Sequence, residues 1–378
     1  MLICLFWIFT LAAVYSYFIY PLALKLLSLR GTKAPNPSDA SAKTFSLIVT
    51  AYNEQGRIQH KIENTLRIDF APARLELIVA SDASDDGTDD IVRGYAEQGV
   101  RLVRAEERLG KENAQLTAIR EATGDIIVFS DVATEIPADA LQHLEAYFSD
   151  PSIGAVSSED RFISHDGIVA GEGAYVKYEM WLRQLESQLG GLVGLSGSFF
   201  AARREVCEHW DIHSPSDFNT ALNAARLGLR AVTAPDVLGF YQDLKDPAKE
   251  YARKIRTVIR GMTGLARHKD VLNPGKFGLF AFQVISHKLM RWLAPWFFIG
   301  LFIVNAMIAG TSSFYSLAFV AQLAFYGTAL AAQFLPNLRD MGPIKIIYFF
   351  VQVNVALLDA AIKFLAGQRM TTWKPSAR

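Results

Sequence analysis

The chain has 378 residues, and its 38 Lys and Arg balance 38 Asp and Glu, which leaves a formal net charge of zero. This length has room for more than one module, and the absence of net positive charge argues against a nucleic-acid partner. Only two cysteines occur, Cys4 and Cys207, so the chain has no disulfide framework.

The first segment is apolar: residues 1–24 carry no charge. About 20 apolar residues suffice to span a bilayer once. A cleaved signal peptide is the alternative, but no basic region precedes the apolar run, and the run continues through Tyr20 and Pro21. We therefore expect residues 1–29 to be an N-terminal transmembrane anchor, with a polar linker at 31–43 behind it.

A globular region follows, in which short apolar runs alternate with longer amphipathic ones. Strands are expected at residues 46–50, 75–80, 100–103 and 125–130, with helices at 54–68, 86–98 and 112–122. Strands that alternate with helices of this length predict an α/β fold with a parallel sheet and right-handed crossovers. In such sheets, ligands bind beyond the carboxyl ends of the strands.

Polar residues stand at those strand ends. Tyr52 and Glu54 follow the first strand, Asp82 the second, and Asp131 the fourth. One such Asp is commonly a helix N-cap, but acids at three strand exits predict a binding site. The segment 81–88 has two interpretations, a capped turn or a polar cradle for a base and ribose.

Lys111 and Asp131 are candidates for handling a diphosphate. Lys111 directly precedes the helix expected at 112–122, whose N-terminus favours an anion, although a solvated lysine is the commoner explanation. Asp131 follows Ser130 at the tip of an apolar strand, where a carboxylate can hold Mg²⁺ or Mn²⁺ together with substrate phosphates. Such a metal neutralises charge on a departing nucleoside diphosphate; the alternative is again a helix cap.

The later part of the globular region adds a base and an acceptor surface. Asp217 opens a helix at 217–227, either as an N-cap or as a general base for an attacking hydroxyl. The small-residue run 195–200, with Gly197 and Ser198, lets a sugar or lipid acceptor approach the backbone closely.

The helix expected at 247–267 has a basic face, made of Lys249, Arg253, Arg256 and Arg260. This face suits anionic lipid headgroups. Alternatively, Arg253 and Arg256 reach a diphosphate, because Arg makes bidentate contacts to oxyanions.

The C-terminal third is apolar again. Residues 293–338 carry no charge and fit two spans with a turn at 310–313, and a third candidate at 346–366 carries Asp359 and Lys363 near its end. We expect an interfacial helix at 277–292 and two or three transmembrane helices within 293–366. Basic residues after the first span and before the second place the globular domain in the cytosol, whereas the basic tail leaves the side of the C-terminus open.

Taken together, these segments resemble the membrane-bound family 2 glycosyltransferases of bacterial polysaccharide synthesis. The matching segments are Ala51-Tyr52-Asn53-Glu54, residues 82–88, Gly110-Lys111 with Ala114, Ser130-Asp131, Ser216-Asp217 and Arg253 to Arg256. They run in the family's order and cover most of residues 45–264.

The resemblance implies a GT-A fold, that of nucleotide-diphospho-sugar transferases, over residues 44–268, and inversion at the anomeric carbon. It implies that Asp131 ligates the metal and that Asp217 is the catalytic base. The residues expected at a nucleotide-sugar donor, with uridine as the expected base, are Ala51, Tyr52, Glu54, Asp82, Ser84, Lys111, Ser130 and Asp131. Those expected at the acceptor or diphosphate are Gly197, Ser198, Arg253 and Arg256.

Three positions depart from the family's pattern. Ala133 stands where a second metal-binding acid is usual, Ser216 where an acid precedes the base, and Thr257 where processive synthases carry a tryptophan. The last departure argues against a cellulose-, chitin- or hyaluronan-type polymerase.

The function that follows is transfer of a sugar from a UDP-sugar to a lipid-linked or growing glycan in cell-surface polysaccharide synthesis, at the inner membrane and in contact with its lipids. The alternatives are a polyprenyl-phosphate glycosyltransferase, a processive polysaccharide synthase, or a non-catalytic partner in a secretion complex.

Overall fold

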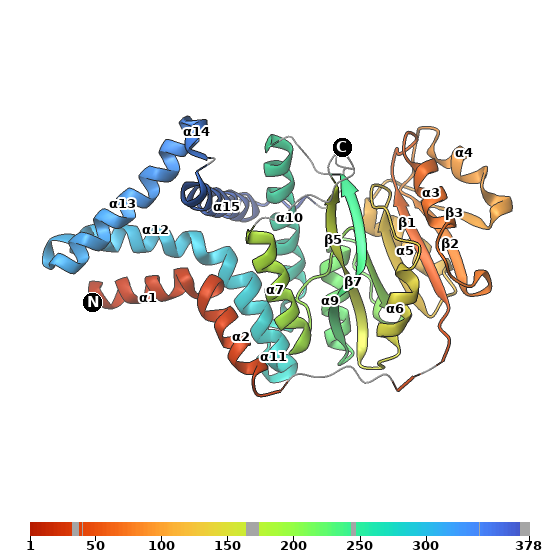
Figure 1. Cartoon of the computed structure of the whole chain (residues 1–378), viewed down its shortest axis with the longest axis horizontal. Coiled ribbons are helices and arrows are strands. Elements are labelled where there is room, and N and C mark those ends of the chain that lie inside the picture. Colours follow the sequence, from red (N-terminus) through yellow and green to blue (C-terminus); the bar gives the residue numbers. More distant parts are fainter. Residues whose placement is uncertain (32–37, 40, 164–173, 243–246, 340, 371–378) are drawn as a thin grey trace. The chain divides into compact units, whose positions relative to one another are not determined.

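The computed structural model describes residues 1–31, 38–39, 41–163, 174–242, 247–339 and 341–370 (Figure 1). Most of the predicted linker 31–43 lies outside them. The chain forms two compact units. We call them the sheet unit, which holds Leu24–Lys249 and Arg260–Gln283, and the helical unit, which holds Met1–Ala23, Glu250–Ile259 and Val284–Arg369.

The sheet unit is built on one seven-stranded sheet in the order β3-β2-β1-β4-β6-β5-β7. Its strands are β1 (Phe45–Ala51), β2 (Leu75–Ser81), β3 (Val100–Arg104), β4 (Ile126–Asp131), β5 (Ile153–Ile163), β6 (Phe199–Arg203) and β7 (Arg230–Gln242). The first four are parallel, as predicted. The sheet is nevertheless mixed, because β6 runs antiparallel to both β4 and β5. Strand β6 begins at Phe199, inside the small-residue run 195–200, so the alternation of strands and helices did not predict it.

Helices cover both faces of the sheet, because neighbouring residues in a strand point to opposite sides. Ile48, Phe129 and Phe200 belong to a core that includes alanines of two helices, α5 (Lys111–Glu121) and α9 (Ser216–Arg226). Leu47, Val128 and Phe199 belong to a second core with the helix α6 (Ala140–Phe148). Helices α3 (Ile58–Leu66), α4 (Thr88–Arg93), α7 (Ala174–Gln188) and α8 (Arg204–Cys207) also belong to this unit.

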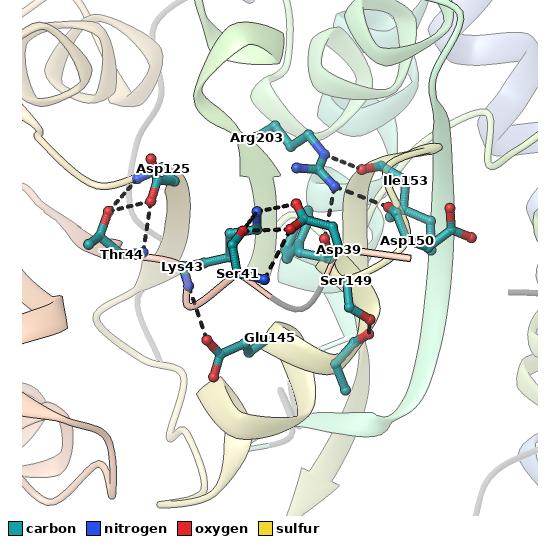
Figure 2. Close-up of polar contacts among 12 residues, drawn as sticks. Asp39, Ser41, Lys43, Thr44, Asp125, Glu145, Ser149, Asp150, Ile153 and Arg203 are labelled. Carbon is teal, nitrogen blue, oxygen red and sulfur yellow. Dashed lines mark hydrogen bonds and ion pairs between the residues drawn. The ribbon is translucent and has the colours of Figure 1, made fainter. Parts of the chain in front are cut away.

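A polar network fixes the amino-terminal end of β1 (Figure 2). The Thr44 backbone N–H and hydroxyl donate to Asp125 Oδ2 at 2.9 and 2.7 Å, and the Lys43 N–H donates to Glu145 Oε1 at 3.2 Å. Arg203, at the end of β6, donates to the carbonyl of Ile153 at 2.7 Å. These contacts lie at the amino-terminal end of β1, opposite the carboxyl ends of the parallel strands. They anchor the sheet there and leave the carboxyl edge, where a ligand is predicted, free of this network.

The helical unit contains long apolar helices. Four helical runs in the described residues are long and apolar enough to cross a membrane: Leu2–Ser28, Pro274–Thr311, Ser313–Phe334 and Gly342–Leu365. The first is α1 (Leu2–Val14), η1 (Tyr15–Ile19) and α2 (Tyr20–Ser28); the second is α11 (Pro274–Val284), η5 (Ile285–Leu289), α12 (Met290–Ile308) and η6 (Ala309–Thr311). The third and fourth are α13 (Ser313–Phe334) and α15 (Gly342–Leu365).

The predicted turn at 310–313 separates the second run from the third. Residues 277–292 form one helical run with the segment behind them, with a non-helical Gly278 near the start. Their interfacial placement stays a prediction.

Helix α10 (Pro247–Arg267) has the predicted bounds. In the helical unit, Ile255 and Ile259 pack against Ala356 and Ala360 of α15. In the sheet unit, Arg260 forms an ion pair with Glu112, with 2.5 Å between Nη2 and Oε1. The expectation that Arg260 shares a headgroup-binding face is therefore wrong, because its guanidinium is turned to an interior carboxylate.

Gly124 tests the packing that brings β1 and β4 together. A Cβ on this residue would lie 2.5 Å from the backbone nitrogen of Ser46 and 2.6 Å from the carbonyl carbon of Phe45. We expect Gly124→Ala to destabilise the protein by about 1–3 kcal/mol, the usual cost of overpacking, and to lower the Tm of the purified protein in detergent. Gly56→Ala is the control, since a Cβ there meets nothing within 4 Å. Equal Tm values for the two variants would contradict this account.

Candidate active site

Three of the predicted segments meet at one edge of the sheet, because register aligns the carboxyl ends of their strands. Ala51 pairs with Ser81 across β1 and β2, and Thr50 pairs with Asp131 across β1 and β4. The Asp82 N–H also donates to the Ala51 carbonyl at 2.9 Å. The strand-exit acids that the sequence predicts as a group therefore do lie around one edge.

The loops after β1 and β2 are bonded to each other. The N–H of Asn53 donates to Ser84 Oγ at 3.2 Å, the N–H of Glu54 to Thr88 Oγ1 at 2.8 Å, and the N–H of Asp85 to Asn53 Oδ1 at 3.0 Å. The segment 81–88 is thus a bonded turn that also shapes the edge. Ser84 is buried and its hydroxyl is used inside the loop, so its contact with a donor stays a prediction.

Asp82 is a fully buried carboxylate with an unused oxygen. Its Oδ1 accepts from the Gly110 N–H at 3.0 Å, while Oδ2 has no hydrogen-bond partner among the described residues. Burial raises the pKa of Asp82, against hydrogen bonds from the Gly110 and Leu109 backbone. Because buried polar atoms are normally satisfied, Oδ2 fits an N–H or hydroxyl of a ligand.

Tyr52 and Glu54 flank this carboxylate on the β1 side. The Arg108 guanidinium stacks 3.8 Å from the centre of the Tyr52 ring, a cation–π contact. Glu54 is buried and paired with Arg57 at 2.6 Å. Burial raises the pKa of Glu54, the Arg57 charge opposes this, and the nearby charge of Asp131 adds to it.

The carboxylates of Glu54 and Asp131 therefore repel each other, and a divalent cation near Asp131 would relieve that repulsion. No cluster of three or more acidic, His or Cys ligands occurs among the residues with defined placement. The donor set is thus one aspartate, which fits Mg²⁺ or Mn²⁺ when substrate phosphates and water supply the other oxygens.

Lys111 joins two parts of the edge. Its side chain is buried, and Nζ donates to Asp131 Oδ1 at 2.5 Å and to the Gly197 carbonyl at 2.8 Å. The interpretation of Lys111 as a solvated lysine is therefore wrong. The ammonium holds the tip of β4 against the small-residue run, next to the place where a diphosphate is expected.

Asp217 lies on the other side of Gly197. A methyl group on Gly197 would sit 3.4 Å from Asp217 Oδ2, and the Leu195 N–H donates to the Asp217 carbonyl at 3.2 Å. The helix N-cap is Pro215, so the N-cap interpretation of Asp217 is wrong. Its partly exposed carboxylate stands in the first turn of α9, within reach of the same run that Lys111 holds.

Two residues of this site escaped the sequence analysis. Asp160 of β5 accepts hydrogen bonds from the hydroxyls of Ser196 and Ser198, both at 2.6 Å. Arg183 of α7 donates to the Gly194 carbonyl at 3.1 Å. Burial raises the pKa of Asp160, and the two serine hydroxyls oppose this. These contacts make the run 194–198 rigid, and no motif marks either residue; only the polar content of strand β5 hints at it.

Helix α3 holds the segment behind Asp131, which the sequence analysis also missed. Lys61 is 1% exposed, and its Nζ donates to the Thr134 carbonyl at 2.5 Å. Asn64, one turn on, makes two hydrogen bonds of 2.9 Å to the backbone of Ile136. Lys61 also lines a cavity of about 420 Å³ between α3 and residues 132–135. Burial lowers the pKa of Lys61 to about 7, against the charges of Asp131 and Glu135.

The predicted contacts of Arg253 and Arg256 with a diphosphate involve a different unit from the site. Both belong to the helical unit, whereas all the site residues above belong to the sheet unit. Their contact with a diphosphate stays a prediction. The side chain of Lys249 lies outside the description.

Comparison with known proteins gives matches over the same region. Residues 46–210 match the family model described as Glycosyl transferase family 2. Beta-monoglucosyldiacylglycerol synthase of Trichormus variabilis is 24% identical over 204 residues, 52% of this chain and 44% of that protein, so the chain spans less than half of that relative. The uncharacterized glycosyltransferase YaiP of Escherichia coli is 23% identical and aligns over 87% of this chain and 85% of its own length.

A solved structure resembles nearly the whole chain. Mannosyltransferase PcManGT from Pyrobaculum calidifontis, in complex with GDP-Man and Mn²⁺, is 27% identical with a TM-score of 0.74, covering 97% of this chain and 99% of its own. This likeness confirms the predicted α/β fold of GT-A type.

The buried ammonium of Lys61 predicts a pH-dependent stability. Between about pH 7, the pKa of Lys61 in the folded protein, and 10.5, its ordinary pKa, the unfolded chain binds a proton at this residue that the folded chain does not. Lys61 therefore lowers the free energy of unfolding increasingly as the pH falls through this range, and by the full amount below about pH 7. We expect Lys61→Met to raise Tm relative to the parent more at pH 6 than at pH 9, by on the order of 5 °C. Lys269→Met, at an exposed lysine, should show no such trend. A Lys61→Met difference that stays constant with pH would refute a proton-linked cost at this site.

Proposed function

We propose, from the match of residues 46–210 to the Glycosyl transferase family 2 model, that the chain is a glycosyltransferase that transfers one sugar, with inversion, from a nucleoside-diphosphate sugar to a lipid-linked or growing glycan acceptor. The observation that carries the proposal is the pair of contacts made by Lys111, to Asp131 and to Gly197. They join a diphosphate-handling carboxylate to the run that faces Asp217.

The donor is expected along the β1 and β2 edge. Asp82 Oδ2 is available to a base or ribose, and the stacked pair of Tyr52 and Arg108 offers a flat surface beside it. Lys111 provides positive charge where the diphosphate would lie. The metal held by Asp131 would neutralise charge on the departing nucleoside diphosphate.

Asp217 is proposed as the general base. It takes the proton of the acceptor hydroxyl as that oxygen attacks the anomeric carbon, and the bond from that carbon to the diphosphate oxygen breaks on the opposite face. One displacement of this kind inverts the anomeric centre. Gly197 has no side chain that could block an acceptor from reaching Asp217. A methyl group at this position would already lie in contact with the carboxylate of Asp217.

Two donor sugars are candidates, and they differ in the nucleobase of the nucleotide. The resemblance of the sequence motifs favours a UDP-sugar. The complex of PcManGT with GDP-Man favours GDP-mannose as the second candidate. The name of the T. variabilis relative, a synthase of beta-monoglucosyldiacylglycerol, supports a lipid acceptor, as do the four apolar helical runs. The alternative, a non-catalytic partner in a secretion complex, would be favoured if glycan production were retained in the Asp217→Asn variant.

The proposed location is the inner membrane, with the sheet unit in the cytosol. Nucleotide sugars are cytosolic. Arg30 follows the first apolar run, and Lys276 and Lys288 precede the uncharged stretch 293–338, which the positive-inside rule reads as cytosolic ends. A role in cell-surface polysaccharide synthesis agrees with the resemblance.

Replacing the proposed base tests the function directly. Purified protein in detergent is offered a panel of UDP- and GDP-sugars with membrane lipid extract, and both nucleoside diphosphate and glycosylated lipid are measured. We expect Asp217→Asn to lower transfer by about 10²–10⁴-fold, the range for a lost acid–base group, with donor affinity unchanged. Asp125→Asn is the control, an acid at the opposite end of the sheet. Transfer at the parent rate by Asp217→Asn would show that Asp217 is not the general base. If the parent protein released no nucleoside diphosphate from any donor in the panel, the proposed donor class would be wrong.

The metal prediction uses Asp131. We expect EDTA to lower transfer by about 100-fold or more, since a metal supplies several kcal/mol, and Mn²⁺ or Mg²⁺ to restore it. By calorimetry, added metal should tighten binding of the nucleoside diphosphate to the parent protein and not to Asp131→Asn. Equal tightening in the variant would show that Asp131 does not hold the ion.

A further inference from the structure

We infer that the buried ion pair of Glu112 and Arg260 is a positioning device for Asp217, so that both residues govern proton transfer without touching substrate. This inference rests on the proposed role of Asp217 as base. It concerns a carboxylate and a guanidinium that the catalytic proposal does not use.

Glu112 holds both ends of the segment that leads to the base. Its carbonyl accepts from the Trp210 indole N–H at 3.0 Å, and its Oε1 accepts from the Ser216 N–H at 3.4 Å. Ser216 directly precedes Asp217. Two acceptor atoms of one residue therefore set where the segment from Trp210 to Ser216 begins and ends.

Arg260 fixes the carboxylate that does this. Its Nη2 donates to Glu112 Oε1 at 2.5 Å, and the side chains are 14% and 2% exposed. A buried carboxylate without a cationic partner is strongly unfavourable. If Arg260 is removed, Glu112 either becomes protonated or turns away, and both changes alter the acceptor for the Ser216 N–H.

The helix that carries Arg260 also packs tightly on the same segment. One turn beyond Arg260, a Cβ on Gly264 would lie 2.8 Å from Ser214 Oγ and 3.0 Å from Phe218 Cδ1. Another turn on, Arg267 pairs with Asp211 at 2.6 Å. The end of α10 thus lies against the start of α9, but only the Arg260 contact passes through a residue bonded to the backbone beside the base.

Glu112 is adjacent in sequence to Lys111, so the contacts of the two residues are linked. Glu112 follows Lys111, which holds Asp131 and Gly197. Two adjacent residues in the first turn of α5 therefore reach the donor side and the base side of one site. A shift of about 1 Å in a catalytic group can cost on the order of 100-fold in rate, so this shared origin keeps the two sides in register.

The experiment is a double-mutant cycle on transfer by the full-length protein in detergent. We expect Arg260→Met to lower kcat by about tenfold or more, with the affinity for nucleoside diphosphate and metal unchanged within about twofold. In the Asp217→Asn background, Arg260→Met should cause no further loss in the residual rate, because residues that act through one group are not additive. Arg260→Lys should recover part of kcat, since it restores a cation.

Arg267→Met is the matched control. It breaks a second arginine–carboxylate pair of the same helix, that with Asp211, but leaves the Glu112 contact to Ser216, so kcat should stay within about twofold of the parent. If Arg260→Met does not fold, Glu112→Gln replaces it, because it keeps the shape and removes the charge.

Two results would overturn the inference: equal losses in Arg260→Met and Arg267→Met, or a full further loss from Arg260→Met in the Asp217→Asn background. Failure of the base assignment is read separately, from Asp217→Asn alone.

Discussion

The site depends on the need of a buried ammonium for oxygen partners. Lys111 is 6% exposed, and an unpaired charge at that depth would be strongly unfavourable. Its partners are the carboxylate of Asp131, at the end of a parallel strand, and the carbonyl of Gly197, just before an antiparallel one. Because both partners must stay within hydrogen-bond distance, this interaction, together with the hydrogen bond from the Asp131 N–H to the Ser198 carbonyl at 2.9 Å, holds the tip of β4 against the small-residue run.

Other buried charged side chains near Lys111 also have hydrogen-bond partners. The run beyond Gly197 is held by Asp160, whose two oxygens each accept from a serine hydroxyl. Asp82 has one buried oxygen left over. Asp89 Oδ1 and Glu112 Oε2 are likewise without a partner among the described residues, but Asp82 alone of the three directly follows a parallel strand at the ligand edge.

The departures from the family's motifs acquire a physical context in the structure. Ala133 leaves Asp131 as the one acid of that motif, and its carboxylate is paired with Lys111. Glu54 is the other carboxylate of this region, and burial, with the charge of Asp131 as a smaller cause, raises its pKa against the charge of Arg57. Ser216 lacks the usual acid, and its backbone N–H is instead bonded to Glu112.

The sequence by itself determined the parallel half of the sheet, the apolar spans and the strand-exit acids, because strand and helix periodicity and unbroken apolar length are local properties. It could not determine strand β5, the antiparallel strand β6, the partners of Lys111, or the ion pair of Glu112 with Arg260. Those join residues as many as 148 positions apart, and such contacts depend on which surfaces the packed layers bring together. Tertiary structure alone therefore decided that Lys111 is a buried link of the site, that Arg260 faces the interior, and that Asp217 stands beside Gly197.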